Sequence, residues 1–286
     1  MQRVALFLAA GNAQPRLGVV EGEELIDISA AAGTNDLTEL IGRAPDWNAL
    51  AAKARSSGAR VAIASAKFLP PVPEPRKIIC LGLNYADHAA EGGHARPEYP
   101  SFFLRVATSL VGHGQGLVRP RVSDKLDYEA ELVLVVSKRA RHLTAANALD
   151  AVAGYSCFND GSLRDYQRKT GQWTIGKNFD ATGAFGPWFV PAADLPPGAA
   201  GLKIESRLNG QVMQSDNTRN MLFPVVETLC LASEAMTLEP GDLIVMGTPS
   251  GVGYARKPPV WMKAGDRIEI EIEGIGVLSN PVVDED

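Results

Sequence analysis

Residues 128–136 form the most informative hydrophobic pattern of the chain, because two acidic residues stand in an otherwise apolar run. Glu129 and Glu131 are two positions apart, so on a β-strand both carboxylates point to the same face. Val133 and Val135 continue that face, and the opposite face carries only apolar residues: Ala130, Leu132 and Leu134. The pattern predicts an interior strand that is covered on both sides. Two carboxylates at its end require compensation, which a bound cation would provide.

The run 268–273 provides an internal comparison, because it also has Glu at every second position. Its other positions are all Ile, so the alternation of apolar and acidic residues is clean. This pattern is typical of a half-buried strand whose acidic face lies in solvent. Glu129 and Glu131 lack such a polar face, although an ordinary acidic pair at a strand end remains an alternative to an ion site.

Predicted strands outnumber predicted helices, and the two kinds of element do not alternate along the chain. Helices are expected over residues 144–152, 162–169 and 223–236. Further strands are expected at 77–82, 101–105, 109–112, 153–158, 187–191, 202–209, 242–247 and 267–273. This order excludes a doubly wound α/β domain and predicts an α+β fold that is mainly β, with a mixed, largely antiparallel core.

Residues 1–70 are expected to form a small N-terminal α/β domain. A helical spacing of apolar residues covers 37–56 and is interrupted at Pro45. Short strands are expected at 4–8, 16–20 and 24–27. Four prolines within residues 70–75 form a stiff, extended connector. We therefore place a domain boundary there, with a catalytic domain over residues 71–286.

The composition is that of an ordinary globular protein: of 286 residues, 45% are hydrophobic and 21% are charged. The net charge of −5 gives no reason to expect nucleic acid or an anionic membrane as a partner. The three cysteines lie far apart and form no CxxC pair, so a disulfide framework is not expected. The sequence shows neither a signal peptide nor an apolar run of membrane-spanning length. A cytoplasmic location is the resulting expectation.

Asp160 is the third acidic residue of interest, because it follows directly on an apolar strand. One role open to it is the N-cap of the helix expected over 162–169. As a third oxygen ligand beside Glu129 and Glu131, it would instead complete a cation site. Three carboxylates without a matching His or Cys set favour Mg²⁺, Mn²⁺ or Ca²⁺ over zinc. Three protein ligands on an octahedral ion leave positions for water or a chelating substrate.

His88 and Glu91 form the best acid–base pair in the sequence, because on a helical turn residues three apart face the same way. A carboxylate beside an imidazole fixes its tautomer and raises its basicity, as a water-activating base requires. An exposed contact on a surface helix is the alternative. The Gly92–Gly93 pair that follows suggests a segment that could close over a substrate.

Five stretches of the chain, in this order, resemble motifs of the fumarylacetoacetate hydrolase family, and the resemblance spans about residues 77–282. The stretches are 84–91, 127–132, 158–160 with 164–167, 173–177 and 240–253. The resemblance implies a β-rich core described as a mixed β-sandwich roll, which in bacterial members of this length follows a small N-terminal domain. It also implies a homodimer.

The resemblance further implies roles for individual residues. It makes Glu129, Glu131 and Asp160 the ligands of a divalent metal, either Mg²⁺ or Mn²⁺, with Ca²⁺ as a further option. It makes His88 and Glu91 a water-activating dyad on a lid. Contacts to the substrate or to an oxyanion are implied for Lys177, Gln167, Arg164, Tyr85, Gly247 and Thr248.

Arg105 departs from the family pattern, because many relatives carry Lys after a similar aromatic–Leu pair. A guanidinium recognises a carboxylate through two parallel hydrogen bonds, whereas an ammonium is a point charge. We therefore expect Arg105 to contact the substrate, and we expect the substrate or the reaction to differ from that of such relatives.

These roles predict a metal-dependent hydrolase that cleaves a C–C bond in an acylpyruvate-like 1,3-diketo acid, in the catabolism of aromatic compounds or sugar acids. His88 would activate water, and Lys177 with Gln167 would stabilise the oxyanion. The same residues suit an isomerase, a tautomerase or a decarboxylase that acts on a 2-oxo or 2-hydroxy-enoic diacid of the oxaloacetate or hydroxymuconate type. A module that binds a metabolite without catalysis is the remaining alternative, although it would need neither His88 nor Lys177.

Overall fold

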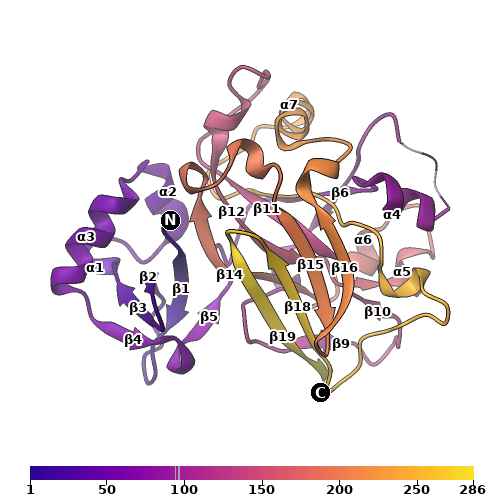
Figure 1. Cartoon of the computed structure of the whole chain (residues 1–286), viewed down its shortest axis with the longest axis horizontal. Coiled ribbons are helices and arrows are strands. Elements are labelled where there is room, and N and C mark those ends of the chain that lie inside the picture. Colours follow the sequence, from indigo (N-terminus) through magenta and orange to yellow (C-terminus); the bar gives the residue numbers. More distant parts are fainter. Residues whose placement is uncertain (94, 96) are drawn as a thin grey trace.

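The computed structural model covers the whole chain and describes residues 1–93, 95 and 97–286 (Figure 1). Its larger sheet has twelve strands in the order β4-β3-β2-β1-β14-β12-β11-β17-β6-β7, with β5 on β1 and β8 on β14. These strands are β1 (Val4–Leu8), β2 (Arg16–Glu21), β3 (Glu24–Asp27), β4 (Arg60–Ala62), β5 (Lys67–Leu69), β6 (Ile78–Gly82), β7 (Ser101–Arg105), β8 (Leu110–Val111), β11 (Ala130–Val136), β12 (Val152–Asn159), β14 (Gly183–Pro191) and β17 (Leu243–Val245).

The second sheet has five strands and packs on the first, with β18 and β19 against β12 and β14. Its strands in spatial order are β16 (Gln211–Asn217), β15 (Lys203–Leu208), β18 (Arg267–Ile272), β19 (Gly276–Asp284) and β9 (Leu117–Arg119). A separate pair joins β10 (Leu126–Asp127) to β13 (Ser162–Leu163). The α+β fold that the sequence predicts, mainly β, is confirmed.

The helices are short and lie around the edges of the sheets (Figure 1). They are α1 (Ser29–Ala32), α2 (Leu37–Gly42), α3 (Trp47–Ser57), α4 (Ala86–Glu91), α5 (Arg164–Gln167), α6 (Thr174–Lys177) and α7 (Val225–Ala235). Within the part of the chain that the structure describes, none of them is long and apolar enough to cross a lipid bilayer.

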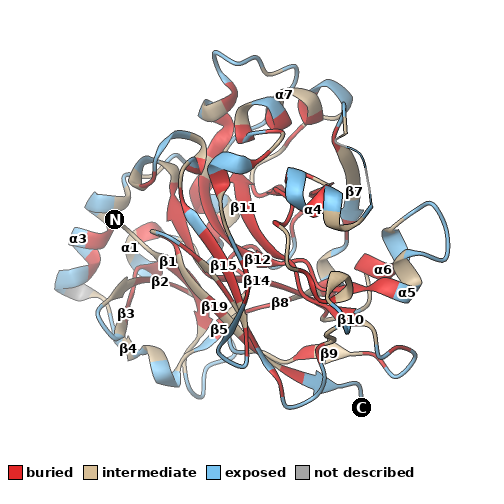
Figure 2. Cartoon of the chain, turned by 45° about the vertical axis from the view of Figure 1, so that its right-hand side comes forward, coloured by how far each residue is buried: buried red, intermediate tan, exposed pale blue. Residues whose placement is uncertain are grey.

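β11 is the interior strand that the sequence pattern predicts. It pairs with β12 on one side and β17 on the other, and all seven of its residues are buried. Its even-numbered residues, among them Leu132, belong to the core between the two sheets, whereas Val133 and Val135 belong to the core shared with the N-terminal strands. Figure 2 shows this strand and its neighbours as the buried centre of the molecule.

The N-terminal strands continue the larger sheet, since Val4 on β1 pairs with Phe189 on β14. One hydrophobic cluster joins N-terminal residues such as Leu6 to Ile78 and Val133 of the main sheet. The domain boundary expected near residue 70 stays a prediction, and the two parts of the chain share a sheet and a core.

Two of the expected helices differ in the structure. Over 144–152 only a 3-10 turn forms, at Ala148–Ala151. Over 162–169 the first two residues pair with β10 as the strand β13, and a single helical turn, α5, follows. The third expected helix is confirmed as α7. Pairing with a strand distant in sequence has therefore overridden the local preference for helix at residue 162.

His113 lies where the two sheets meet, and we expect it to make the free energy of unfolding depend on pH. Its Nδ1 accepts a hydrogen bond from the N–H of Ser279 at 3.1 Å, and its ring packs on Phe68. Burial, followed by the charge of Arg267, lowers the pKa of His113 from 6.5. The unfolded chain therefore takes up a proton at a higher pH than the native protein does. We expect the free energy of unfolding to fall as the pH drops below 6.5 towards the lowered pKa.

The measurement is urea unfolding of the wild-type chain and of His113→Asn at about pH 7.5 and about pH 5.5. Asparagine offers an oxygen acceptor that does not titrate. On acidification, the free energy of unfolding of the wild-type chain should fall by up to about 1 kcal/mol more than that of the variant. This is the magnitude of one hydrogen bond. An equal loss in both proteins would contradict the assignment.

Candidate active site

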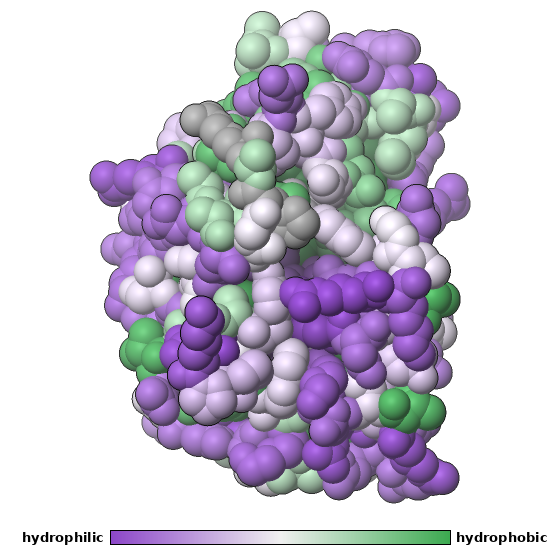
Figure 3. Space-filling model, turned by 90° about the vertical axis from the view of Figure 1, so that its right-hand side faces the viewer, coloured by the Kyte–Doolittle hydropathy of each residue, from purple (hydrophilic) through white to green (hydrophobic). Residues whose placement is uncertain are grey.

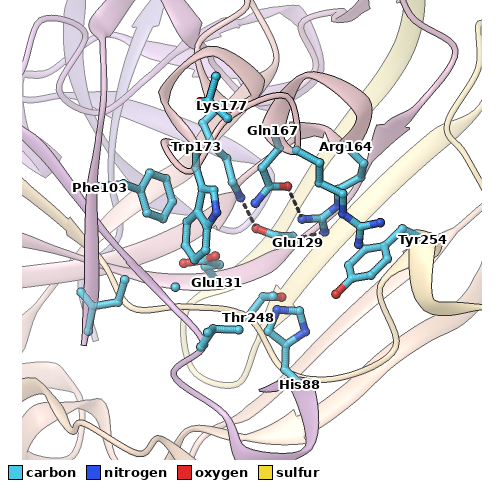
Figure 4. Close-up of a pocket in the computed structure, with 15 residues that line it drawn as sticks. His88, Phe103, Glu129, Glu131, Arg164, Gln167, Trp173, Lys177, Thr248 and Tyr254 are labelled. Atoms are coloured by element: carbon cyan, nitrogen blue, oxygen red, sulfur yellow. Dashed lines mark hydrogen bonds and ion pairs between the residues drawn. The ribbon is translucent and has the colours of Figure 1, made fainter. Parts of the chain in front are cut away.

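A cavity of about 290 Å³ lies between α4, α5 and α6. Figure 3 looks at the face that carries these helices and shows that hydrophilic side chains predominate on it. Figure 4 shows the side chains that line the cavity. They come from Leu81, Gly82, Leu83, His88, Phe103, Glu129, Glu131, Arg164, Gln167, Arg168, Thr170, Trp173, Lys177, Thr248 and Tyr254.

The register of β11 and β12 brings the three predicted metal ligands together. Ala130 pairs with Asn159, so Glu129 and Asp160 lie directly beyond this pair, and the N–H of Asp160 donates to the carbonyl oxygen of Glu129 at 3.0 Å. Glu131 follows on the face that Glu129 also occupies. Carboxylate oxygens of the three residues lie within 4.8 Å of one another, and all three residues are buried.

Lys177 bridges two of these carboxylates. Its Nζ donates to Oε2 of Glu129 and to Oδ2 of Asp160, each at 2.6 Å. Burial alone would lower the pKa of Lys177, but Asp160 and Glu129 raise it above the usual value. The lysine ends the single-turn helix α6, so these ion pairs fix the helix at the cavity.

Arg164 is the second buried cation. It donates from Nε to Oδ2 of Asp127 at 2.8 Å and from Nη2 to Oε1 of Glu129 at 2.6 Å. Its Nη1 donates to Oε1 of Gln167 at 2.9 Å, which turns the NH₂ group of this amide away from Arg164. Burial would raise the pKa of Glu129, but Arg164 and Lys177 hold it well below its usual value.

Arg105 binds the far side of Asp160 instead of lining the cavity. Its Nη1 donates to Oδ1 of Asp160 and, at 3.0 Å, to the carbonyl oxygen of Gly161. A Cβ atom on Gly183 would lie 2.5 Å from the guanidinium, so this glycine makes room for Arg105. Arg105 thus supports a metal-ligand candidate, and its expected contact with a substrate stays a prediction. Asp160 makes ion pairs with Arg105 and Lys177 and is not a helix N-cap, because α5 begins four residues later.

Glu131 is the carboxylate whose charge is left without a cation partner. It accepts a hydrogen bond from the N–H of Gly247 at 2.5 Å, and no described cation forms an ion pair with it. Burial, followed by the charges of Asp160 and Glu129, raises the pKa of Glu131 well above its usual value.

The charge balance of the site fits a bound divalent cation. Four buried carboxylates, the triad and Asp127, face three buried cations, Arg105, Arg164 and Lys177. If all four carboxylates were ionised, one negative charge would remain on Glu131, and the cost of leaving that charge without a cation is what raises the pKa of Glu131. The donors are all carboxylate oxygens, which suit Mg²⁺, Mn²⁺ or Ca²⁺.

His88 and Glu91 meet on α4 as the sequence predicts. The Nδ1 atom of His88 lies 2.9 Å from Oε1 of Glu91. The N–H of Gly251 donates to both carboxylate oxygens of Glu91, at 3.1 and 2.9 Å, and thereby fastens α4 to the glycine-rich loop. Asn84 anchors the start of this segment, since its Nδ2 donates to the carbonyl oxygens of Met246 and Phe223. His88 is buried and lines the cavity, so its contact with Glu91 is not an exposed pair on a surface helix.

The remaining predicted contacts fall into two groups. Gln167 and Thr248 line the cavity together with Lys177 and Arg164. Tyr85 and Gly247 do not: Tyr85 is buried with its hydroxyl unpaired among the described residues, and the N–H of Gly247 is taken by Glu131. Their contacts with a substrate stay predictions.

An aromatic wall of the cavity has no counterpart in the sequence prediction. Phe103 and Trp173 pack edge to face with ring centroids 5.5 Å apart, and a Cβ on Gly82 would lie 2.1 Å from the indole. Tyr254 stacks under the guanidinium groups of Arg164 and Arg168, whose carbons lie 4.6 and 4.5 Å from the ring centroid. These contacts join segments that lie far apart in the chain, so no local sequence pattern predicts them.

Comparisons with known proteins identify the family of the chain. The family model described as fumarylacetoacetate (FAA) hydrolase C-terminal matches residues 77–283. The mitochondrial oxaloacetate tautomerase FAHD2A of Bos taurus is 38% identical over 288 residues, which cover 98% of this chain and 91% of that protein. The fumarylacetoacetate hydrolase EaFAH from Exiguobacterium antarcticum superposes with a TM-score of 0.87 at 36% identity and covers 100% of both chains. Maleylpyruvate hydrolase from Sphingobium sp. SYK-6, in complex with manganese(II) and pyruvate, gives a TM-score of 0.83 at 30% identity over 99% of this chain and 100% of that one.

The chain therefore belongs to the fumarylacetoacetate hydrolase family. The family and its fold are confirmed as the sequence predicts them. The named relatives include a tautomerase and two hydrolases, so membership alone does not decide the reaction. The expected homodimer and the cytoplasmic location stay predictions.

Glu131→Gln tests the cation site. The variant removes the one unpaired charge, so we expect Mn²⁺ or Mg²⁺ to bind at least 10- to 100-fold more weakly, the loss typical of a perturbed metal shell. The metal-free variant should unfold at a temperature at least as high as that of the metal-free wild type, because glutamine cannot acquire the buried charge that burial and the neighbouring carboxylates disfavour on Glu131. Calorimetric titration and thermal unfolding measure the two effects.

Glu271→Gln is the matched control, since Glu271 stands in the other alternating strand with its side chain 46% exposed. It should leave the affinity for the cation unchanged. Equal affinities in Glu131→Gln and Glu271→Gln would remove Glu131 from the metal site.

Proposed function

We propose that the chain is an enzyme that uses a divalent cation to interconvert the keto and enol forms of a 2-oxo dicarboxylate of the oxaloacetate type. The observation that carries the proposal is the position of His88. Its imidazole lines the cavity beside the acidic triad, and Glu91 occupies its Nδ1. Nε2 is then available to take a proton from a bound molecule and to return it. The similarity to an oxaloacetate tautomerase over almost the whole chain supports this choice.

Glu129, Glu131 and Asp160 would hold the cation, which when bound supplies a Lewis acid for the carboxylate and 2-oxo oxygens of such a substrate. The structural neighbour that holds manganese(II) and pyruvate supports this assignment. Mg²⁺ and Mn²⁺ both suit three carboxylate ligands with positions left for oxygens of the substrate.

The protein side chains divide the remaining work. His88 removes a proton from the carbon next to the 2-oxo group and returns one, while Glu91 holds the imidazole in place. In the view of Figure 4, Lys177 and Gln167 lie across the carboxylates from His88. Both present N–H groups that can donate to the oxygen on which negative charge gathers. The amide of Gln167 is already turned for this role by Arg164.

A second carboxylate on the substrate would be recognised by Arg168 at the rim of the cavity. Its guanidinium stacks on Tyr254, and no described residue accepts a hydrogen bond from it. Arg164, on the same ring, has its donors bound to Asp127, Glu129 and Gln167. Arg168 is therefore the arginine whose planar donor pair is available for a carboxylate.

Hydrolysis of a C–C bond in an acylpyruvate-like acid is the second candidate. The same His88–Glu91 pair that moves a proton on carbon can remove one from water. The structural similarity to maleylpyruvate hydrolase supports this candidate. It differs from the first in requiring a water molecule within reach of His88.

The first test follows enol–keto exchange of oxaloacetate by the ultraviolet absorbance of the enol, with the purified chain and Mg²⁺. We expect acceleration that a chelator abolishes and added Mg²⁺ restores. Because His88 moves the proton, His88→Ala should lower kcat by about 10²- to 10⁴-fold and leave the binding of Mn²⁺ unchanged.

His142→Asn is the control for this test, because His142 is exposed and outside the cavity and Asn tolerates its positive φ of 53°. Its rate of enol–keto exchange should match that of the wild type. Cleavage of acetylpyruvate without any exchange of oxaloacetate would replace the first candidate by the second. Full activity of His88→Ala in both assays would exclude both mechanisms.

Arg168→Gln tests the class of substrate. It removes the paired donors at the rim, so kcat/KM for oxaloacetate should fall about 10- to 100-fold, the value of a hydrogen bond to a charged group. The exchange of a monocarboxylate, phenylpyruvate, should change little. Equal losses of kcat/KM for the two acids would show that Arg168 does not select a second carboxylate. Arg139→Gln, at an exposed residue, is the control for the loss of a positive charge.

A further inference from the structure

Gln214 is a buried polar residue beside the site that the proposed reaction does not use. It stands on β16 in the second sheet and is 1% exposed. Its side chain reaches the first sheet, where Oε1 accepts a hydrogen bond from the N–H of Ala130 at 3.0 Å. Because β17 pairs with β11 only from Val133 onward, Gln214 supplies the acceptor that this buried N–H requires. Ala130 separates Glu129 from Glu131, so the amide is tied to the strand that carries two metal-ligand candidates.

The partners of the Gln214 amide fix its orientation. Oε1 also accepts from the hydroxyl of Ser206 at 2.9 Å, and Nε2 donates to the carbonyl oxygen of Pro249 at 2.8 Å. A main-chain N–H only donates and a carbonyl oxygen only accepts, so the reversed amide is excluded. The other hydrogen of Nε2 therefore goes to Oγ1 of Thr248, at 2.8 Å.

This hydrogen bond determines what the hydroxyl of Thr248 can do. Because its oxygen accepts from Gln214, its own hydrogen must be directed to a different acceptor. Among the described residues no such acceptor is present, and Thr248 lines the cavity, near His88 in Figure 4. A carboxylate of a bound molecule is the acceptor that a hydroxyl in this position would bind most strongly.

We propose that Gln214 is a positioning residue that holds Thr248 as a hydrogen-bond donor to the carboxylate of the substrate. This inference rests on the proposed function, which places a 2-oxo acid in the cavity. Gln214 does not line the cavity, so its influence passes through Thr248. It consequently acts on the affinity for the carboxylate and leaves the proton transfer by His88 unchanged.

The test is the binding of pyruvate to the Mn²⁺-loaded chain, measured by calorimetry, because this readout needs no turnover. Thr248→Val removes the donor. Gln214→Glu keeps an oxygen for Ala130 and Ser206 but replaces the NH₂ group by an oxygen that takes up the Thr248 hydrogen. Each variant should bind pyruvate about 10- to 100-fold more weakly, as expected for a hydrogen bond to a charged group.

The double variant separates positioning from a general structural effect. In the Thr248→Val background, Gln214→Glu should add little, because the hydroxyl through which it acts is gone. Ser206→Ala is the matched control: it removes one partner of the same amide, and pyruvate affinity should stay close to that of the wild type. Mn²⁺ titration and thermal unfolding of each variant show whether the triad and the fold are intact.

The outcomes distinguish this inference from the function on which it rests. Failure of the wild-type chain to bind pyruvate would overturn the proposed function and the role of Gln214 with it. Pyruvate binding that is equal in the wild type and Gln214→Glu, or losses that are additive in the double variant, would overturn the role of Gln214 alone. Thr248→Ser keeps the hydroxyl and should retain the affinity, so a loss as large as that of Thr248→Val would also overturn it, even if Gln214→Glu does not fold.

Discussion

The buried charge cluster at the ends of β11 and β12 is the constraint on which the rest of the site depends. Isolated carboxylates in apolar surroundings would each cost several kcal/mol, so Glu129 and Asp160 require cations close by. Lys177 contacts both of them, at 2.6 Å each. The cations are buried as well and depend equally on the carboxylates. Each partner therefore holds the other in place, and the third carboxylate, Glu131, has no cation partner among the described residues, which suits a bound metal ion.

This mutual dependence explains how very short elements can form a well-defined site. α5 and α6 have four residues each, too few for a helix that is stable by itself. Arg164 begins α5 and Lys177 ends α6, and both donate to Glu129. The helices are thus positioned by ion pairs to one strand. The second sheet reaches the same strand through Gln214, so both layers of the fold contribute to the site.

The sequence predicts what depends on local pattern and misses what depends on long-range contact. The acidic pair stands out in the sequence, because burial on both faces of β11 makes the other residues of the strand apolar. The position of Asp160 is also visible, because it comes directly after a largely apolar strand. The helix expected over 162–169 is found only in part, as α5, since Ser162 pairs instead with Asp127, which lies far from it in the chain. Gln214 shows no sequence pattern at all, because its role depends on partners from three separate segments.

Under the proposed function, the choice between tautomerisation and hydrolysis depends on the surroundings of His88 more than on the triad. Both reactions begin when the imidazole takes a proton, from carbon in the first case and from water in the second. Glu91 accepts from Gly251 through both oxygens, so α4, which carries His88, is fastened beside the cavity. The aromatic pair of Phe103 and Trp173 covers another wall. Walls that kept water away from a bound acid would favour proton transfer within it and disfavour attack by hydroxide. Small changes in these walls would admit water without altering the triad, which gives a physical reason why one family includes both a tautomerase and hydrolases.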